Sequence, residues 1–461
     1  MTAIWKFVSV TFLIFAFSTA SDACVNQEGK LVDSENVVLK LAQVIKEQFA
    51  NKSIAEDVAA ALMADVKAGK YKHIQQAKIL ETKLTEDLRR LSGDNHIGMV
   101  CDPVAVKRYQ ARAQSSHSES AKVNDEKNRA NQLHESRIEN FGIKKVELKN
   151  GYIGFLEMHY FDGHLEESKE IFAGAMNLLS GAKVIIIDLR RNGGGNSKIL
   201  PLFLSYFLGP EPVHFATQYT RWKDEEKKLY TIGNVQGARH FDKPIYILTS
   251  GTTFSLAEHV TYHLRAFRQA TIIGERTYGG GRAFDPVVID DQFYVRMPRI
   301  DIINAADNSM YKEGLGIQPD ILTTAENAPA VAYLHAINHL LENETRPQEK
   351  SDLQWLRRTV SIENDSPIKN SLPKLVGKKH FGEFTFEIRQ NKWLWMSFRG
   401  LPWVRLNNLG DGYFYDDRSI QRQFTFSKEK GRWKVDLHQL GEPTKEIYEQ
   451  SRKAVSGKSN L

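Results

Sequence analysis

Apolar residues recur at helical spacing between residues 37 and 91, in three successive stretches. Residues three or four positions apart line one face of a helix, so each stretch predicts an amphipathic helix. Gly69 and Gly93 follow the second and third stretches, where a glycine commonly ends a helix. We therefore predict a small N-terminal helical domain over residues 24–104.

The helical pattern stops after Val106, and polar and charged residues dominate as far as Arg137. Aliphatic residues are too sparse in this stretch to form a buried face, which is typical of a linker or a mobile loop. We predict a polar linker at 105–141.

Alternating and apolar runs then resume and predict an α/β core over residues 142–342. The runs Ile143–Leu148 and Tyr152–Met158 flank Asn150-Gly151. Because Asn-Gly supplies the positive φ angles of a tight turn, these runs predict a β-hairpin. A helical pattern from Ala328 to Leu341 closes the core.

Two strand-loop-helix units lie inside this core. The β-branched run Val184–Ile187 leads into a loop with glycines at 193–195, and the apolar run Pro244–Leu248 leads into a turn that ends at Ser255. A helical pattern, 256–267, leaves that turn. Successive units of this kind predict parallel strands whose carboxyl ends share a crevice.

The last part of the chain, residues 343–461, changes character after a polar spacer around Arg346 to Ser351. Aromatic residues punctuate short alternating segments between Phe381 and Trp433. This pattern predicts an accessory domain of antiparallel strands, a small barrel or sandwich. We expect its aromatic residues to form a core, with a ligand platform as the alternative.

The composition is that of an ordinary soluble globular protein, with 41% hydrophobic and 26% charged residues. The 461 residues are enough for two or three domains. The net charge of +6 comes without a dense lysine-arginine block, so we predict no nucleic-acid partner.

The first residues differ from the rest of the chain. Lys6 precedes an apolar run from Phe7 to Phe17, and small residues follow, which is the order of a secretory signal. We predict a signal peptide at 1–23 and a secreted or periplasmic protein. The run is too short to span a bilayer, and no later segment is long and apolar enough. No integral membrane segment is therefore expected after signal removal.

Cys24 and Cys101 are the two cysteines of the chain. In an oxidising compartment they can form one disulfide, which is the pairing that we favour. The alternative is that Cys24 carries a lipid anchor, although the residues before it match a lipoprotein signal poorly. Two cysteines so far apart do not indicate a metal site, and we predict no metal and no cofactor.

Ser255 is the first candidate for chemistry, because it stands where a strand ends and a helix begins. The free N–H groups at a helix start can stabilise a developing negative charge, which suits a serine nucleophile. The alternative is that Ser255 only caps the helix, as most serines at such positions do. Backbone N–H groups in the glycine loop at 193–195 and at Leu256 are candidate oxyanion donors.

A serine nucleophile needs a base, and the residues alone leave its choice open. His259 lies one helical turn beyond Ser255, while His96, His159 and His164 lie before or inside the core. His96 stands in a turn directly after a helix stop, where an exposed histidine without a function is the alternative.

Motif spacing argues against a dinucleotide site, a P-loop and an α/β-hydrolase. The glycine loop has neither the Gly-x-Gly-x-x-Gly of a dinucleotide site nor the Gly-Lys-Ser/Thr of a P-loop. An α/β-hydrolase fits poorly, because Ser255 is not framed by Gly-x-Ser-x-Gly and no suitable histidine follows it. An anion-binding turn remains.

Four motifs in order resemble those of peptidase family S41. They are Asp188-Leu189-Arg190-x-Asn192-x-Gly194-Gly195, Thr249-Ser250-x-x-Thr253-x-Ser255-x-Ala257-Glu258, Gly274-Glu275-x-Thr277-x-Gly279-Gly280 and Glu313-Gly314-x-Gly316-Ile317-x-Pro319-Asp320. The closest likeness is to the branch of the tricorn core protease and the interphotoreceptor retinoid-binding proteins. The resemblance covers roughly residues 30 to 340 and implies a crotonase-like (ClpP-type) α/β spiral core.

The resemblance also implies roles for individual residues. Ser255 would be the nucleophile, and the N–H groups of Gly194 and Leu256 would form the oxyanion hole. The processing branch of the family uses a lysine base after its third motif, but this chain has Gly280 there. In the tricorn-like branch a histidine and a glutamate serve instead, and His96 and Glu313 match them.

Glu258 and Gly195 remain as residues that can contact substrate, and Glu258 can equally be structural. A fourth member of the catalytic set has no recognisable counterpart in this chain.

We therefore predict an exported serine peptidase that hydrolyses peptides or unfolded proteins by a Ser-His-Glu mechanism. One alternative is a non-catalytic binding protein for an apolar ligand, such as a retinoid or a lipid. A further alternative is a hydrolase that uses the same three residues on esters.

Overall fold

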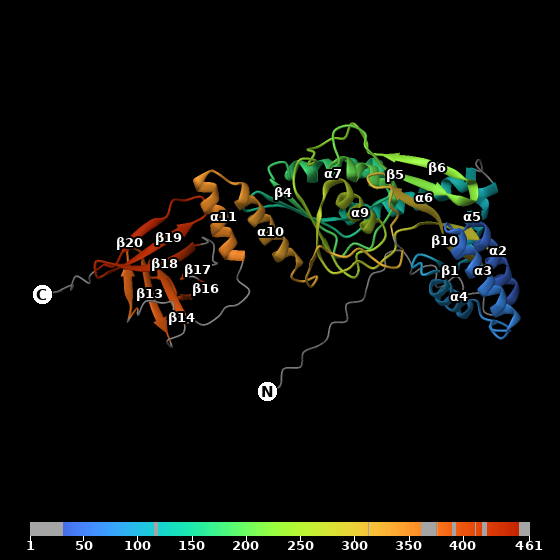
Figure 1. Ribbon diagram of the computed structural model, residues 1–461, viewed down its shortest axis with the longest axis horizontal. Helices are drawn as coiled ribbons and strands as arrows, with labels where there is room; N and C mark the ends of the chain where they lie inside the picture. The colour runs from blue at the N-terminus through green and yellow to red at the C-terminus, as the bar shows by residue number, and fades with distance from the viewer. Residues whose placement is uncertain are drawn as a thin grey trace, which may run out of the picture. The chain divides into compact units, whose positions relative to one another are not determined.

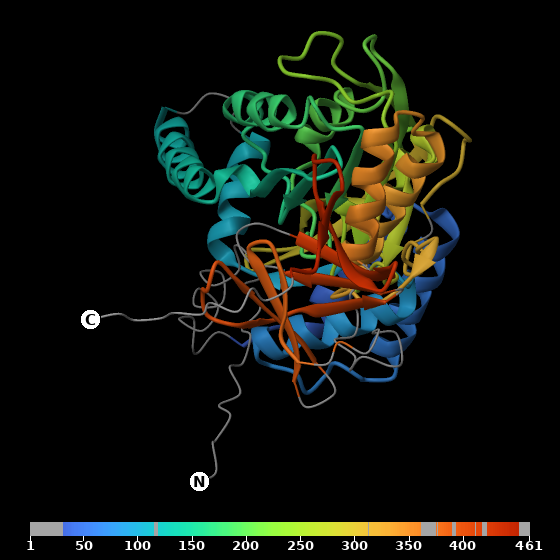
Figure 2. The same ribbon diagram turned by 90° about the vertical axis from the view of Figure 1, so that its left-hand side faces the viewer.

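The computed structural model describes most of the chain (Figures 1 and 2). The described residues are 31–114, 119–311, 313–360, 375, 377–389, 393–410, 412–416 and 422–450. The predicted signal peptide at 1–23 and Cys24 lie outside them. The described residues form two compact units: the first takes its residues from 1–146, 156–180 and 187–325, and the second from 147–155, 181–186 and 326–461.

The N-terminal helices of the first unit form as predicted. They are α2 (Ser34–Gln48), α3 (Lys52–Lys67) and α4 (Ala77–Ser92), and Figure 1 draws α2 and α3 side by side in blue. Asp33 and Asn51 cap α2 and α3 by accepting backbone N–H bonds of 3.2 and 3.0 Å. The three helices share a core built from Val38, Leu41, Ile45, Phe49, Leu62, Leu80, Leu84 and Leu88.

The polar segment 105–141 is largely helical, whereas its composition predicts a linker or loop without regular structure. It contains α5 (Pro103–Gln114), α6 (Glu119–Ile138) and the short η1 (Asn140–Gly142). Alanine, lysine, glutamate, arginine and glutamine favour a helical backbone even where they form no apolar stripe. A search for apolar periodicity therefore misses such a helix.

The predicted parallel sheet is present. Its strand order is β11-β8-β7-β4-β3-β2, and β7 pairs with β8, and β8 with β11, in parallel. The strands are β2 (Ile143–Lys149), β3 (Ile153–Met158), β4 (Val184–Asp188), β7 (Ile245–Thr249), β8 (Thr271–Gly274) and β11 (Ile321–Leu322). Every residue of β4 and β7 is buried, as expected for strands covered on both faces.

Short helices follow the strands of this sheet. They are α7 (Leu165–Leu178) after β3, η2 (Ser197–Ile199) and α8 (Leu200–Ser205) after β4, and α9 (Leu256–Arg268) after β7. Neighbouring strands β4 and β7 thus end side by side, each in a loop that leads to a helix. The α/β class of the core is confirmed.

A second sheet in the first unit joins the helical segment to the core. Its order is β1-β10-β5-β6, with β9 paired to β10. The strands are β1 (Gly98–Cys101), β5 (His214–Thr220), β6 (Glu225–Tyr230), β9 (Ala283–Val288) and β10 (Phe293–Asn304), and η3 (Arg221–Lys223) connects β5 to β6. Antiparallel pairing places Gly98 opposite Arg296 and Cys101 opposite Phe293. Cys101 is buried and disulfide-bonded.

The second unit carries two helices and two antiparallel sheets. The helices α10 (Ala328–Asn343) and α11 (Pro347–Val360) lie side by side in both views, drawn in orange. The polar residues 346–351, expected as a spacer, lie at the start of α11. Lys183 is within 2.7 Å of Glu349 and 3.2 Å of Glu344, so ion pairs hold this helix start.

The antiparallel C-terminal domain is confirmed. Its sheets have the orders β12-β13-β14-β15 and β16-β17-β18-β19-β20. The strands are β12 (Lys379–Phe381), β13 (Phe384–Arg389), β14 (Trp393–Phe398), β15 (Val404–Arg405), β16 (Asn407–Gly410), β17 (Tyr413–Asp416), β18 (Arg422–Glu429), β19 (Arg432–Gln439) and β20 (Lys445–Tyr448). Most of the aromatic residues form the core as predicted, among them Phe381, Phe384, Phe386, Phe414 and Phe424.

Tryptophans 393, 395 and 403 of the C-terminal domain are only half-buried. Arginine side chains cover their rings. Arg405 lies 4.4 Å from the ring of Trp393, and Arg389 lies 4.9 and 4.6 Å from the rings of Trp395 and Trp403. These rings already have cationic partners within the domain.

Within the part of the chain that the structure describes, no helix is both long enough and apolar enough to cross a membrane.

Packing around α9 predicts a loss of stability in acid. His263 is fully buried, and neither of its ring nitrogens has a hydrogen-bond partner among the described residues. Burial and the neighbouring His259 lower the pKa of His263 to about 3. A histidine whose folded pKa lies below its ordinary value of 6.5 stabilises the fold fully above pH ~6.5. That stability is lost as the pH falls toward 3.

We expect His263→Phe to flatten the pH dependence of unfolding, because phenylalanine keeps the contact with Phe215 and takes up no proton. Between pH ~7.5 and pH ~5 about 2 kcal/mol of the wild-type stability loss should disappear. Urea unfolding across this range measures it. The exposed His73, changed to phenylalanine, is the control, and equal slopes in wild type and His263→Phe would contradict the prediction.

Candidate active site

Ser255 occupies a sharp turn between β7 and α9. Its backbone has φ 57° and ψ −121°, a combination that a residue other than glycine rarely adopts. Such strain persists only where the surroundings fix it, and it is common at functional positions. The turn presents the side chain at the carboxyl end of the sheet, directly before the first turn of a helix.

The loop after β4 holds this turn in place. The Thr253 hydroxyl donates to Leu189 O at 2.8 Å and accepts from Ser250 N at 2.9 Å. Phe254 N donates to Asn192 O at 3.1 Å. The two strand-loop-helix units that the sequence predicts are thus hydrogen-bonded to each other at the crevice.

His96 reaches Ser255 from the N-terminal helical segment. α4 ends at Gly93 in the left-handed conformation, Ser92 Oγ accepts from Asp94 N at 3.1 Å, and Asp94 Oδ1 accepts from His96 N at 2.8 Å. This tight turn places His96 Nε2 at 3.0 Å from Ser255 Oγ. With the ring proton on Nδ1, Nε2 is free to accept the serine proton.

Glu313 faces the other nitrogen of the His96 ring. Its Oε1 lies 3.7 Å from His96 Nδ1, and the two side chains are only 5% and 4% exposed. Neither atom has a hydrogen-bond partner among the described residues. Because both are buried and otherwise unpaired, each is the other's natural partner. Such bonds are often long in a free enzyme and shorten when substrate binds.

The backbone fixes the Glu313 carboxylate in this direction. Its Oε2 accepts from Gly281 N at 2.8 Å and from Arg282 N at 2.9 Å. Burial alone would raise the pKa of Glu313, but the facing His96 ring and the bonds from these two N–H groups hold the pKa below its ordinary value. The side chain is therefore ionised at neutral pH and can stabilise an imidazolium.

Two aromatic rings fix the plane of the imidazole. Phe254 stacks on His96 with ring centres 4.6 Å apart and planes at 26°, and Phe284 lies 5.6 Å away at 34°. Gly280 closes in beside them. A Cβ at position 280 would lie 2.1 Å from the Phe254 ring and 2.9 Å from His96 Cε1. No side chain fits at this position while His96 stays in place.

Glu258 is fully buried and accepts five hydrogen bonds. Its donors are Ser255 N (3.0 Å), Gly279 N (2.9 Å), Gly280 N (2.8 Å), Tyr311 Oη (2.6 Å) and Thr277 Oγ1. Both carboxylate oxygens are engaged, which favours the structural alternative for this residue over contact with substrate. Burial and the charge of Glu258 raise the pKa of Tyr311, so its phenol stays a donor.

The predicted oxyanion donors lie beside Ser255, but they differ in availability. A Cβ on Gly194 would lie 2.7 Å from Ser255 Cβ and 2.9 Å from Leu256 N, so the glycine loop and the helix start meet here. Gly194 N donates to Asn192 Oδ1 at 2.9 Å and is thus already engaged. The N–H groups of Leu256 and Gly195 have no acceptor among the described residues. Leu256 is thus the member of the predicted pair whose N–H is free, and Gly195 is a free donor next to Gly194.

The other candidate histidines lie elsewhere. His259 Nε2 pairs with the carbonyl of Gly281, and burial lowers the pKa of His259 to about 4. His159 pairs with Glu157 at 2.9 Å. His164 lies 2.8 Å from Asp162. Of these side chains, His96 is the one within hydrogen-bond distance of Ser255.

One group of side chains among the described residues lies close enough together to hold a metal ion. It comprises Asp94, His96 and Glu313, whose possible ligand atoms lie within 4.8 Å of one another. These three side chains do not suit a metal ion. Asp94 Oδ2 faces the Arg282 guanidinium at 3.4 Å, and one oxygen of each carboxylate already accepts backbone N–H groups. A fixed positive charge and engaged oxygens favour a hydrogen-bonded charge cluster.

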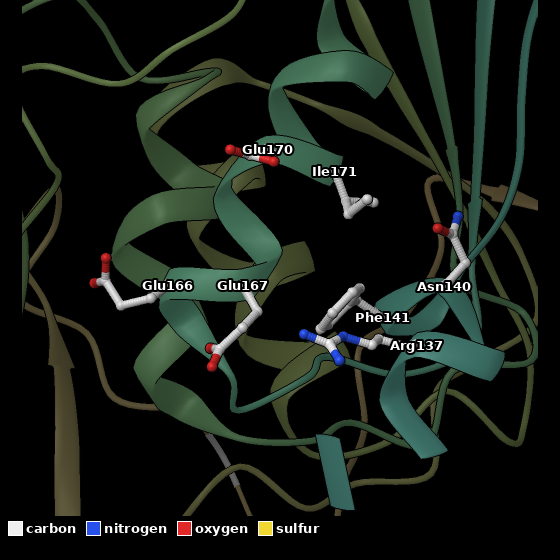
Figure 3. A pocket seen from close by; sticks show the side chains of 7 residues that line it. All are labelled: Arg137, Asn140, Phe141, Glu166, Glu167, Glu170 and Ile171. Atoms are coloured by element: carbon white, nitrogen blue, oxygen red, sulfur yellow. The ribbon is translucent and has the colours of Figure 1, made fainter. Parts of the chain in front are cut away.

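A cavity of about 530 Å³ lies apart from these residues, between the end of α6, η1 and α7 (Figure 3). Its lining comprises Arg137, Asn140, Phe141, Glu166, Glu167, Glu170 and Ile171. None of the candidate catalytic side chains borders it. The cavity therefore says nothing about the reaction at Ser255.

Some residues of the site could not be predicted from the sequence. Asn192 is fully buried, supports Phe254 through its carbonyl and holds Gly194 through its side chain. Phe284 contacts the base from β9, and nothing in its local pattern marks it. The position of Asp94, two residues before His96, indicates that it lies near the histidine. Its contact with Arg282, which is 188 positions away, could not be predicted.

The fit of Gly280 against His96 predicts a sensitive position. We expect Gly280→Ala to displace His96 or Phe254 and to slow the reaction of Ser255 with a fluorophosphonate probe by about 10²-fold, because small misplacements cost this much. Stopped-time labelling and mass spectrometry measure the rate. Gly174→Ala, on α7 with open space around the new carbon, is the control. Labelling at the wild-type rate in Gly280→Ala would contradict the packing argument.

Two family models match parts of this chain. The model of peptidase family S41 matches residues 151–323. The model of the N-terminal domain of peptidase family S41 in eukaryotic IRBP matches residues 32–141. The second match includes the segment 105–141 together with the N-terminal helices.

Curated relatives and solved structures are similar over parts of the chain. The carboxy-terminal processing protease CtpA of Bacillus subtilis (strain 168) is 25% identical over 192 residues, which is 41% of this chain and 39% of that protein. A CtpA-like serine protease of Staphylococcus epidermidis (strain ATCC 12228 / FDA PCI 1200) is 23% identical over 212 residues, which is 46% of this chain and 40% of that protein. The chain thus spans about two fifths of the length of these relatives.

A solved structure of a peptidase from Parabacteroides merdae ATCC 43184 has a TM-score of 0.44 at 17% identity, covering 64% of this chain and 90% of that one. The two family matches together take in most of the helical segment and the core, including Ser255 and Glu313 in the first and His96 in the second. The chain belongs to peptidase family S41.

Proposed function

We propose that this protein is an exported serine peptidase that hydrolyses peptide bonds in peptides or unfolded proteins. The observation that carries the proposal is the alignment of three side chains. Ser255 Oγ lies 3.0 Å from His96 Nε2, and Glu313 faces the opposite ring nitrogen. A nucleophile, a base and an orienter in this order are the requirement for acyl transfer.

The reaction follows from these positions. Neutral His96 takes the proton of Ser255 Oγ as that oxygen attacks the substrate carbonyl carbon. Glu313 stabilises the imidazolium that forms and keeps the ring in place. The imidazolium then gives its proton to the leaving amine, and an acyl-enzyme remains. Water, activated by His96 in the same way, releases the acid and restores Ser255.

Backbone N–H groups stabilise the oxyanion of each tetrahedral intermediate. Leu256 N stands at the start of α9 and has no acceptor among the described residues, and the positive end of the helix dipole adds to its effect. The glycine loop supplies a second donor. Gly194 does so if its N–H leaves Asn192 Oδ1, and Gly195 does so without such a change. One donor of this kind contributes on the order of 10²–10³ in rate.

The surface next to His96 suits an apolar substrate side chain. Tyr278 is 53% exposed and Phe284 41% exposed. Phe254 joins them, since its ring lies 5.1 Å from Tyr278 and 4.6 Å from His96. An extended or unfolded peptide can lay an apolar residue against these rings while its carbonyl meets Ser255.

Export is part of the proposal and rests on the sequence. The charged, apolar and small-residue order of residues 1–23 supports a secreted or periplasmic location. The disulfide-bonded state of Cys101 is consistent with an oxidising compartment.

Three substitutions test the mechanism. Ser255→Ala, His96→Ala and Glu313→Gln should each reduce kcat for a fluorogenic unfolded substrate by about 10⁴-fold or more, because the three groups act as a unit. His159→Ala is the matched control and should retain wild-type activity. Peptide hydrolysis that persists in purified Ser255→Ala would refute the proposal.

The same preparations distinguish the alternatives. A wild-type protein that leaves a fluorophosphonate probe unreacted and carries a co-purified lipid is a binding protein. Hydrolysis of esters without hydrolysis of peptides, in a parallel panel, would identify an esterase that uses the same three residues.

A further inference from the structure

Two buried carboxylates stand next to the His96 ring. One oxygen of Asp94, one ring nitrogen of His96 and one oxygen of Glu313 lie within 4.8 Å of one another. The Asp94 side chain is fully buried, like the ring itself. Glu313 alone is enough to orient the ring, so the second carboxylate calls for an explanation.

The Asp94 carboxylate has a structural task that does not need its charge. Its Oδ1 accepts the backbone N–H of His96 at 2.8 Å and closes the turn that carries the base. An asparagine oxygen can make the same bond, since such turns accept either residue. Burying a charge where a neutral amide could make the same bond costs free energy. The carboxylate at position 94 therefore suggests a role for the charge itself.

Charged groups surround Asp94 on several sides. Arg282 Nη1 lies 3.4 Å from its Oδ2, and Arg282 Nε lies 3.0 Å from Asp301. One guanidinium is thus shared by two aspartates. With Glu313 also ionised, negative charge exceeds positive charge around the ring.

One further titratable group lies near the ring. Burial lowers the pKa of His259 to about 4, so His259 is neutral when the enzyme works near neutral pH. It adds no charge. Among the residues that the structure describes, the groups whose charge acts on His96 from nearby are therefore Asp94, Glu313 and Arg282.

The ionisation of Asp94 falls in a useful range. Burial and the charge of Glu313 raise the pKa of Asp94 to about 6, while His96 and Arg282 favour its ionised form. At neutral pH the carboxylate is ionised, at a cost, beside the ring that must become positive during the reaction.

We propose that Asp94 is the fourth member of the charge cluster, a positioning residue that acts through His96 and stabilises its imidazolium together with Glu313. This inference rests on the proposed peptidase mechanism. It gives Asp94 two tasks: the oxygen that accepts the His96 N–H positions the ring, and the negative charge favours its protonated form. Asp94 itself contacts neither the substrate nor Ser255.

The direction of the effect follows from reciprocity. A charge on His96 favours the ionised form of Asp94, so the charge on Asp94 favours protonated His96 to the same extent. Removing the Asp94 charge should therefore make the imidazolium harder to form. Catalysis slows, and the pH at which free His96 takes up its proton moves down.

Asp94→Asn separates the two tasks, because the amide oxygen can keep the bond to His96 N. We expect kcat at the pH plateau to fall about 10- to 100-fold with KM nearly unchanged, given an effective dielectric constant of about 20. The acid limb of kcat/KM should move to lower pH. Hydrolysis of one fluorogenic peptide from pH ~5 to pH ~9 measures both.

Asp290→Asn is the matched control. Asp290 Oδ1 closes the same kind of turn, accepting Gln292 N and Phe293 N at 2.8 Å. No contact joins it to His96, Glu313 or Arg282 among the described residues. Both pH limbs and kcat should match wild type in this variant.

Two outcomes would overturn the inference. Asp94→Asn with kcat within twofold of wild type makes Asp94 a turn residue only. A fall in kcat with an unmoved acid limb means that the substitution distorts the turn and that the charge has no part.

A second readout separates this inference from the peptidase proposal. NMR of the histidine ring, recorded without substrate, follows the protonation of His96 in wild type and Asp94→Asn. A lower protonation pH in the variant supports the charge effect even if no peptide is cleaved. Active wild-type enzyme with identical His96 titrations in the two proteins rejects the role of Asp94 and leaves the peptidase intact.

Discussion

The buried carboxylate of Glu258 is the constraint on which the site depends. An ionised side chain removed from water is tolerated only when its oxygens are fully hydrogen-bonded. Glu258 meets that requirement through three backbone N–H groups and two hydroxyls, with no cationic partner among the described residues. Its partners are the strained nucleophile turn, the 277–280 loop and Tyr311. The φ angle of Ser255 can be maintained because this carboxylate holds the Ser255 N–H, while the same side chain locks the loop that packs against the base.

Glu258 and Glu313 share one stretch of backbone. Gly279 and Gly280 donate to the first carboxylate, and Gly281 and Arg282 donate to the second. Four consecutive N–H groups thus connect the nucleophile helix to the residue that orients the base. A chain that turns so tightly between two anions has no room for side chains on its inner face, and at position 280 the space is filled by Phe254 and His96. The missing lysine of the processing branch is therefore more than a sequence difference, because His96 occupies the space next to Gly280.

The sequence was most informative where periodicity or a motif reports on backbone. The parallel strands β4 and β7 were predictable from their apolar runs, and the motifs pointed to Ser255, His96 and Glu313. Helices α6 and α11 were not predicted, because polar residues of high helix propensity leave no apolar stripe to detect. Two further features could not be predicted from the sequence: the hydrogen bond from Gly194 N to Asn192 and the burial of Glu258. Both depend on which donors and acceptors the tertiary fold brings together, and the spacing of residues along the chain does not indicate those contacts.

The contact between His96 and Ser255 gives the N-terminal segment a direct part in the proposed chemistry. His96 and Ser255 are 159 positions apart, and His96 leaves α4 only three residues beyond its C-cap. The pairing of β1 with β10 and the contact of Asp94 with Arg282 fix that exit turn against the core. Any movement of α4 relative to the core would withdraw the imidazole from Ser255 before it disturbed the nucleophile turn itself. Under the proposed mechanism the helical segment is accordingly a component of the catalytic centre, and a core that lacked it would keep its serine and its N–H donors but would have no base.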